Sequence, residues 1–202
     1  FTTIAIMQLR DEGHLMLDDP LIQHLPEFAA VRAIAGTVKG VTIRRLLTHH
    51  AGLATEPPIS GWNTLRFPTR EELISNLSET SIVIPPDSAW KYSNLAFGLL
   101  GEVVSRISGA PYTEYLYKNV TRPLGLTSTV FDLSDKLRPH SFVGYNPTLC
   151  PDHPERAPSS HLNGLSSAGQ LYSTVYDLAK WVSFQFRTDG GSRQKEQVLD
   201  GQ

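Results

Sequence analysis

The chain has 202 residues, of which 40% are apolar and 19% charged, so it can bury a core and has the composition of an ordinary soluble globular protein. At about 150 residues per domain, one domain is the expectation. The net charge of −2 and the scattered lysines and arginines exclude the basic stripe of a nucleic-acid-binding protein. Cys150 is the only cysteine, which excludes an internal disulfide, and no apolar run approaches the ~20 residues that cross a bilayer.

The first residues are predicted to form a helix that its neighbours enclose, because positions 1–9 are apolar on almost every face. Gly13 ends this helix. The chain opens on Phe1 already in helical pattern with no capping residue ahead of it, so we expect a cut inside a helix. Further on, Asp18 or Asp19 is predicted to cap a short helical piece that has Pro20 in its first position.

Residues 41–43 are predicted to be a short extended piece. Within it, Thr42 is a candidate cap for a helix over 43–49, and Ala51 with Gly52 closes the following turn.

A long loop is predicted at 55–67, which contains two prolines and Trp62. Loops of this length are often functional or packed on the surface. Thr69 follows as the cap of a helix that runs to about 77, with Glu72 in the capping-box position.

The most informative stretch begins at a turn over 85–87, where two prolines preset the backbone and an aspartate can bond to it. Tyr92, Ser93 and Asn94 come next. They lead into a predicted helix over 95–108, whose apolar residues recur at helical spacing.

Gly109 is the predicted C-terminal stop of that helix, and Pro111 opens a second helix that runs to about Thr121. Residues 128–137 are interpreted as a strand or extended piece that runs into a turn, and 138–161 as a proline-rich loop.

The C-terminal part begins with a small, polar segment over 164–173, which suits close backbone approach. Thr174 is predicted to cap a last helix over 175–187. One face of this helix carries apolar side chains, namely Leu178, Trp181, Val182 and Phe186. The remaining residues are polar and are predicted to form a surface turn.

The triplet Tyr92, Ser93 and Asn94 resembles the Tyr-x-Asn element of the serine penicillin-recognising enzymes, specifically class C β-lactamases, their esterase relatives and D-alanyl-D-alanine peptidases. Other blocks are similar to the family pattern in the same order, including MQLRDEGHLMLDDP, RRLLTHHAGL and GLSSAGQLYSTVYDLAKW. A Tyr-x-Asn alone is a weak signal. Four ordered blocks that cover nearly the whole chain indicate common descent.

In this family a serine of a Ser-x-x-Lys motif attacks an acyl carbonyl, and the lysine and the Tyr-x-Asn tyrosine handle its proton. A serine hydroxyl is a poor nucleophile until a base takes that proton. The resemblance gives the catalytic role to Tyr92 and a substrate-binding role to Asn94, whose amide offers both donor and acceptor. The alternatives are a half-buried packing aromatic for Tyr92 and an ordinary helix N-cap for Asn94.

The resemblance places the family's nucleophile about five residues before Phe1, outside this chain. Two formal Ser-x-x-Lys matches begin at Ser88 and Ser192. Neither begins a buried apolar helix, so we interpret both as chance matches of a short pattern. In the segment over 164–173, Ser166 and Ser167 are candidates for lining the site, with ordinary turn serines as the alternative.

The family's Lys-Thr-Gly or His-x-Gly element is also missing. His50, Ala51 and Gly52 fit His-x-Gly as letters, but they more closely resemble a structural Leu-Leu-Thr-His-x-x-Gly-Leu turn in which His49 is the histidine. His153 and His161 share a loop without metal-ligand spacing. We therefore predict no metal and no cofactor.

The resemblance implies an α+β fold, in which a helical lobe lies beside an antiparallel sheet, with residues 1–202 as a single partial domain truncated at both ends. It implies a serine hydrolase that forms an acyl-enzyme on an ester, amide or β-lactam, and we expect this chain alone to be inactive. The alternative is a non-catalytic binding or regulatory protein that retains the fold, because fold does not settle function.

A small acyl substrate is the expected partner, with neither nucleic acid nor a membrane span. Self-association of the truncated chain is also expected, because apolar helices would lose the cover of a sheet. The family suggests a periplasmic or secreted location, although no signal peptide is visible in these residues.

Overall fold

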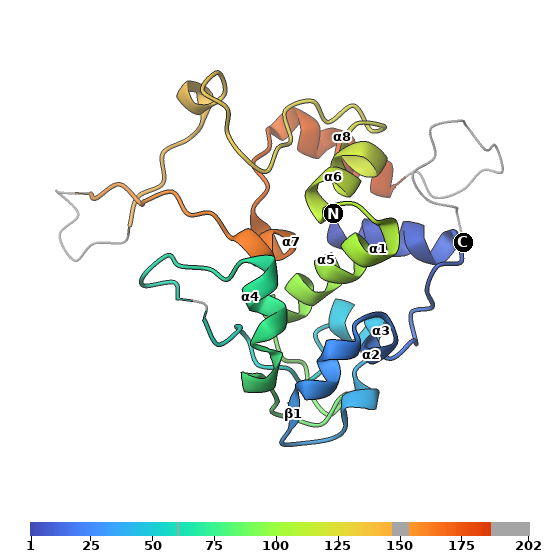
Figure 1. Cartoon of the computed structure of the whole chain (residues 1–202). Helices are drawn as coiled ribbons and strands as arrows, with labels where there is room; N and C mark the ends of the chain where they lie inside the picture. The colour runs from blue at the N-terminus through green and yellow to red at the C-terminus, as the bar shows by residue number, and fades with distance from the viewer. Residues whose placement is uncertain (60, 147–153, 187–202) are drawn as a thin grey trace.

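The fold is built around one helix, α5 (Asn94–Ser108), which lies at the centre of the molecule in the computed structural model (Figure 1). The structure describes residues 1–59, 61–146 and 154–186. Helices α1, α2, α3, α6 and α7 all pack against α5. Because it is surrounded, its apolar residues are buried on several faces, namely Leu95, Ala96, Leu99, Leu100, Val103 and Val104.

The prediction of an enclosed N-terminal helix is confirmed by α1 (Thr2–Asp11). Four of its apolar residues are buried: Ile4, Ala5, Ile6 and Leu9. The Thr2 hydroxyl donates to the carbonyl of Ser167 at 2.7 Å and lies 2.7 Å from the hydroxyl of Tyr112. Gly13, at φ 77°, follows the end of the helix, as the sequence predicts.

The aspartates after α1 do not cap a helix, so that prediction is wrong. Helix α2 (Leu21–His24) begins after Pro20 without a side-chain cap, and the 3₁₀ helix η1 (Pro26–Ala30) follows. Asp19 instead accepts the N–H of Met16 at 2.7 Å and lies 2.9 Å from His24 Nε2. The carboxylate of Asp19 therefore closes a turn upstream of α2, and that of Asp18 pairs with Arg44 of α3.

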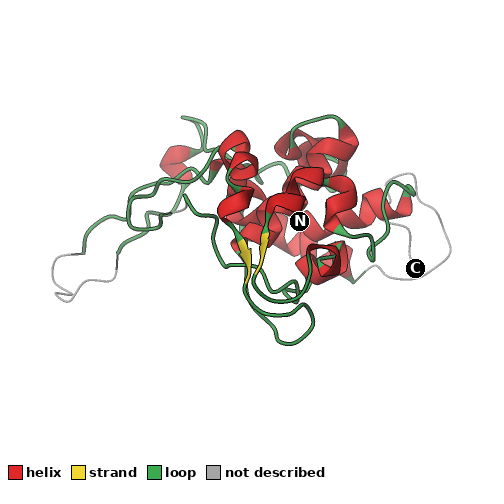
Figure 2. Ribbon diagram, turned by 60° about the horizontal axis from the view of Figure 1, so that its bottom comes forward, coloured by secondary structure: helices red, strands yellow, loops and turns green. Residues whose placement is uncertain are grey.

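The sheet within the described residues is one short parallel pair, β1 (Arg32–Ala33) with β2 (Ser81–Ile82), which lie side by side in Figure 2. Helix η2 (Val38–Gly40) and helix α3 (Ile43–Leu47) follow β1 in the chain. Thr42 caps α3 through a bond from the N–H of Arg45 and pairs with Pro20 in an isolated bridge. The predicted cap is therefore confirmed, whereas the predicted extended piece is limited to residues 41–42, because Ile43 already belongs to α3, which ends two residues earlier than predicted.

Helix α4 (Arg70–Ser75) carries the predicted capping box, in which Thr69 and Glu72 bond to each other's backbone N–H. It ends two residues earlier than predicted, and η3 (Leu77–Glu79) continues the chain.

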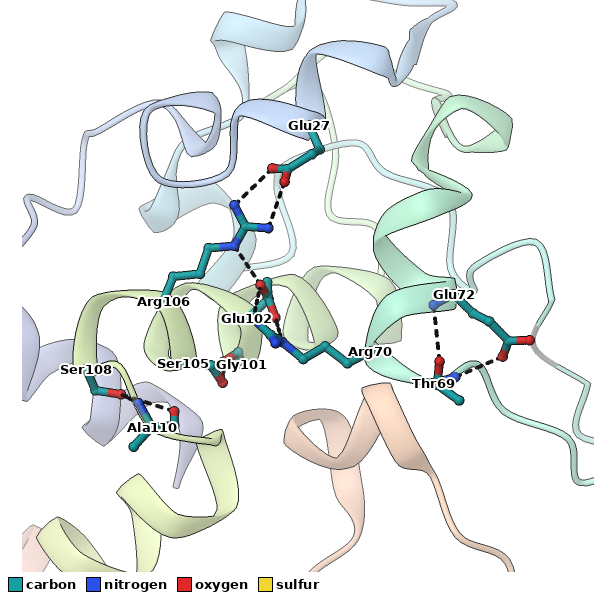
Figure 3. A network of polar contacts seen from close by, with 10 residues as sticks. All are labelled: Glu27, Thr69, Arg70, Glu72, Gly101, Glu102, Ser105, Arg106, Ser108 and Ala110. Carbon is teal, nitrogen blue, oxygen red and sulfur yellow. Dashed lines mark hydrogen bonds and ion pairs between the residues drawn. The ribbon is translucent and has the colours of Figure 1, made fainter.

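Arg70 ties α4 to α5 through the carboxylate of Glu102, whose side chain is only 2% exposed. Glu102 also accepts a bond from Arg106, and Arg106 reaches Glu27 of η1 with two bonds of 2.9 and 3.0 Å (Figure 3). One buried carboxylate therefore joins α4 and η1 to the central helix.

Beyond α5, Pro111 precedes α6 (Tyr112–Leu116), and the π-helical turn η4 (Tyr117–Thr121) extends it to the predicted end. Burial raises the pKa of Tyr112 to about 12.

Val130 pairs with Tyr172 in an isolated bridge, so the predicted strand is reduced to a single pairing. The short helix η5 (Arg138–His140) lies in the predicted proline-rich loop, and the described residues 141–146 and 154–161 of that loop extend away from the helical body (Figure 1).

The remaining helices are η6 (Asn163–Leu165), α7 (Ser166–Gly169) and α8 (Val175–Gln185). Thr174 caps α8, as predicted, by accepting the N–H of Asp177. Trp181 of α8 stacks on Phe1, with ring centroids 3.9 Å apart. The other members of the predicted apolar face are exposed at 43–78%, namely Leu178, Val182 and Phe186.

Among the described residues, no helix is long and apolar enough to cross a membrane. Cys150, His153 and Ser192, together with the polar C-terminal turn predicted from the sequence, lie outside the described residues.

Candidate active site

The two site residues predicted from the sequence lie in direct contact. The Tyr92 hydroxyl donates to Asn94 Oδ1 at 2.9 Å, and the Tyr92 side chain is 45% exposed. At this exposure Tyr92 is also a half-buried aromatic, because its ring packs on His49 with centroids 4.7 Å apart, so the geometry is compatible with both the catalytic role and the packing alternative.

Asn94 is held from its other side by the long loop over 55–67. Its Nδ2 donates to Glu56 Oε1 at 2.5 Å, and Trp62 Nε1 donates to the same oxygen at 3.0 Å. A carboxylate only accepts hydrogen bonds, so it fixes the amide with Oδ1 directed at Tyr92. The sequence predicted a long and often functional loop here, but nothing in the local pattern singled out Glu56.

Asn94 is not the N-cap of α5, so that alternative is wrong. Ser93 occupies the cap, and its Oγ accepts the N–H of Ala96 at 3.0 Å. Because Ser93 satisfies the helix end, the Asn94 side chain is left for the contacts with Tyr92 and Glu56.

A pocket of about 220 Å³ opens beside this pair. It combines the polar ends of Tyr92, Asn94 and Trp62 with a mostly apolar wall, and it is lined by Trp62, Tyr92, Asn94, Leu162, Leu165, Ala168 and Gly169.

The segment over 164–173 reaches the pocket, but not through the two serines that the sequence nominated. Leu165, Ala168 and Gly169 line it. Ser167 is 7% exposed, and its hydroxyl donates to the carbonyl of Phe97 at 2.8 Å. Ser167 therefore packs α7 onto α5, where Gly101 allows the approach, since a Cβ there would lie 2.2 Å from Ser167 Oγ.

The backbone around Tyr92 is bonded to the segment over 49–55. The N–H groups of Asn94 and Leu95 donate to the carbonyl of Thr55 at 2.8 and 3.1 Å. Ser93 Oγ donates to the carbonyl of Ala54 at 2.7 Å. Gly52, at φ 71°, permits the close approach of this segment to Ile84, because a Cβ there would lie 2.1 Å from the carbonyl oxygen of Ile84.

The formal Ser-x-x-Lys match at Ser88 does not form a nucleophile and base pair. The Ser88 hydroxyl donates to the carbonyl of Pro85 at 2.6 Å, whereas Lys91 Nζ donates to Thr55 Oγ1 at 3.1 Å. Ser88 lies in an exposed turn next to Asp87, which has φ 63°. Its hydroxyl has no base within this arrangement, which agrees with a chance match.

The described histidines have separate partners. His161 Nε2 lies 3.0 Å from Asp132, and His24 pairs with Asp19. Within the ranges that the structure describes, no three histidine, cysteine or carboxylate side chains are grouped so as to hold a metal ion.

Comparison with known proteins identifies the family of the chain. A profile of the family described as Beta-lactamase matches residues 1–202, and the chain belongs to this family. Its fold is that of the serine β-lactamases and penicillin-binding proteins, and at family level it is a hydrolase sequence.

The chain is 32% identical over 199 residues to the D-alanyl-D-alanine-carboxypeptidase/endopeptidase AmpH of Escherichia coli K12, covering 96% of this chain and 49% of that protein. It is 28% identical to the putative penicillin-binding protein PbpX of Bacillus subtilis, covering 88% of this chain and 41% of that one. The chain therefore spans about half the length of the curated relatives that it matches.

Solved structures show the same fold. A β-lactamase/D-alanine carboxypeptidase from Yersinia pestis superposes with a TM-score of 0.76 at 24% identity, covering 98% of this chain and 54% of that one. The octameric penicillin-binding protein homologue from Pyrococcus abyssi gives a TM-score of 0.70 at 28% identity, covering 98% of this chain and 45% of that one.

Proposed function

We propose that the whole protein is a serine hydrolase that forms an acyl-enzyme on a small ester, amide or β-lactam substrate. The observation that carries this proposal is the 2.9 Å bond between the Tyr92 hydroxyl and Asn94 Oδ1 at the edge of a pocket. Family membership supplies the reaction class, and residues 1–202 are one partial domain of that enzyme.

In this proposal Tyr92 moves the proton of the attacking serine and Asn94 binds the substrate. Tyr92 is 45% exposed and lines the pocket, which makes its side chain accessible to a substrate group there. The Asn94 amide has a second N–H and a second lone pair beyond the bonds to Glu56 and Tyr92, which suits an amide or ester carbonyl group of a substrate.

The nucleophile is a serine of a Ser-x-x-Lys motif from the part of the enzyme outside residues 1–202. Ser88 and Ser192 supply the only matches inside the chain, and the Ser88 hydroxyl is bonded to a backbone carbonyl. The 202 residues by themselves are therefore inactive.

Mass spectrometry with an acylating probe tests both the hydrolase assignment and the inactivity of the 202 residues by themselves. The whole protein and the 202-residue chain are incubated separately with a fluorophosphonate and with a penicillin, and their intact masses are measured. We expect one adduct on the whole protein and none on the chain. A stoichiometric adduct on Ser88 or Ser192 contradicts the assignment of the nucleophile, and an unlabelled whole protein contradicts the hydrolase.

Hydrolysis assays then separate the substrate classes. A chromogenic ester, a cephalosporin and a D-alanyl-D-alanine peptide cover the chemistry that the names of the relatives describe.

A further inference from the structure

His49 is bonded to the backbone on both sides of Tyr92. The carbonyl of His49 accepts the N–H of Lys91 at 2.8 Å, and its ring Nδ1 accepts the N–H of Ser93 at 3.2 Å. These two bonds bracket Tyr92 in the chain. The backbone position of Tyr92, and with it the direction of the hydroxyl toward Asn94, depends on His49.

The imidazole of His49 is enclosed by aromatic rings. The ring centroids of Tyr92, Phe97 and Trp90 lie 4.7, 5.1 and 5.7 Å away. The backbone of His49 has φ 59°, a left-handed conformation that few residues other than glycine adopt. The ring is therefore held in one orientation by its packing and by the turn that carries it.

The bond from Ser93 defines the protonation state of the ring. A backbone N–H only donates, so Nδ1 carries no proton and the neutral ring has its hydrogen on Nε2. A protonated ring would direct an N–H at the N–H of Ser93, a residue that is 2% exposed. Protonation of His49 therefore removes the acceptor of a buried donor.

The groups around His49 favour the neutral ring. Burial lowers the pKa of His49, and the charge of His50 lowers it further. The segment before α5 contributes Tyr92 and Lys91, and the Lys91 ammonium bonds to Thr55.

Three further charged groups lie on the segments that meet at this turn. Asp87 is paired with Arg45 of α3, and the carboxylate of Glu56 is bonded to Asn94 and Trp62. The contact from α5 is the apolar ring of Phe97.

We propose that His49 is a positioning residue. Its neutral imidazole fixes the segment over 91–94, and with it the Tyr92 and Asn94 pair. Protonation of the ring releases that segment. Its relevance to catalysis rests on the proposed function, whereas the positioning itself does not.

The direction of the pH effect follows from the pKa. The folded-state pKa of His49 lies below the ordinary histidine value of about 6.5, so the unfolded chain binds more protons as the pH falls below that value. The stabilisation is complete above about pH 6.5 and is lost as the pH falls toward the folded-state pKa. The ordered segment is therefore a property of neutral and alkaline pH.

Nitrogen NMR of the whole protein, labelled at histidine, tests the proposal directly. We expect a neutral His49 with its proton on Nε2, a pKa below about 6.5, and a Ser93 amide proton whose shift follows the same midpoint. A proton on Nδ1 of the neutral ring, or a Ser93 amide that does not respond to this titration, overturns the proposal.

Two substitutions make the test selective. His49→Asn retains an acceptor at the δ1 position and tolerates left-handed backbone, but it cannot titrate. In this variant the hydrogen-exchange protection factor of the Ser93 amide should be the same at pH 5 and pH 7. In the parent that factor should fall about tenfold as the pH drops from 7 to 5. His49→Gln moves the acceptor by one carbon and should lose that protection at every pH. Equal pH dependence in His49→Asn and the parent contradicts the proposal, and the titration of the parent decides it even if a variant folds poorly.

His50→Asn is the matched control, because the ring of His50 bonds to the carbonyl of Thr48 within its own turn. The His50→Asn variant should retain the parental response of the Ser93 amide to the titration of His49, with a slightly higher pH midpoint. Catalysis is a separate measurement: kcat/KM of the parent should have an acidic limb that His49→Asn lacks. If the NMR result holds but the whole protein takes no acyl adduct and hydrolyses none of the substrates, the positioning stands and the proposed function fails.

Discussion

Ser93 and Ala96 define the start of the central helix, because Ser93 Oγ accepts the N–H of Ala96 at 3.0 Å while it donates to the carbonyl of Ala54 at 2.7 Å. Ser93→Ala removes both bonds. We expect a loss of about 1–3 kcal/mol in the free energy of unfolding, from a lost cap and a buried carbonyl left without this donor. Urea denaturation of the parent and the variant measures it.

Asn94→Ala is the control for this prediction. Asn94 lies one residue inside the helix, so its truncation should cost less stability than that of Ser93 while it removes the partner of Tyr92. A larger stability loss in Asn94→Ala than in Ser93→Ala would show that the cap is assigned to the wrong residue.

The approach of α7 to α5 depends on Gly101. A Cβ at this position would lie 2.2 Å from Ser167 Oγ, so Gly101→Ala should destabilise the protein by about 1–3 kcal/mol through overpacking. Gly169→Ala is a suitable control, since a Cβ there has no neighbour within 4 Å among the described residues. Thermal melts distinguish the two. Similar melting temperatures would mean that α7 moves away from α5 at little cost, because rotation of the Ser167 side chain leaves its Cβ 2.5 Å from the added Cβ.

The carboxylate of Glu102 depends on two arginines. Removing either Arg70 or Arg106 leaves it one partner, whereas removing both leaves a charge with a side chain only 2% exposed. We expect the double change to methionine to cost about 3–5 kcal/mol, more than the sum of the single changes. Arg106→Met also frees Glu27, whose pKa the bond from Arg106 holds below its usual value. A double-mutant cycle by denaturation measures the coupling, and additive losses would contradict it.

The apolar face of α8 is predicted to bind a partner surface. Val175, Tyr176 and Phe186 are 78–83% exposed, and they adjoin the half-exposed Leu178 and Val182. Contiguous apolar patches of a few hundred Å² seldom remain free in solution. The isolated 202-residue chain should therefore self-associate or bind a hydrophobic dye. Sedimentation that gives a compact monomer without dye binding argues against this, and Val182→Glu should reduce association without changing α5.

Local patterns in the sequence were sufficient for the longer helices and for three caps, but not for η6 and α7, which lie where a small, polar segment was predicted. Thr42, Thr69 and Thr174 all accept the bond that their position predicts, because capping depends on the residue and its immediate neighbours. Ser93 and Asn94 are both good caps, so the pattern alone could not choose between them.

The site was only partly predictable, because its bonds join distant parts of the chain. Tyr92 and Asn94 came from a motif of three residues. The bond from Asn94 to Glu56 spans 38 residues, and the bond from Ser93 to His49 spans 44. No helical or strand period encodes such contacts, which form only once the loop over 55–67 and the His49 turn pack against α5.

Tyr92→Phe in the whole protein distinguishes catalysis from packing. The change keeps the ring and its contact with His49, so stability should fall by no more than the ~1 kcal/mol of one net hydrogen bond, here the bond to Asn94. A proton-transfer role predicts a much larger effect on acylation or deacylation, about 10²- to 10⁴-fold. The measurement is turnover of a chromogenic ester and a cephalosporin, with thermal melts of the same samples. If the variant retains more than about half of the parental rate on every substrate that the parent hydrolyses, Tyr92 does not transfer the proton.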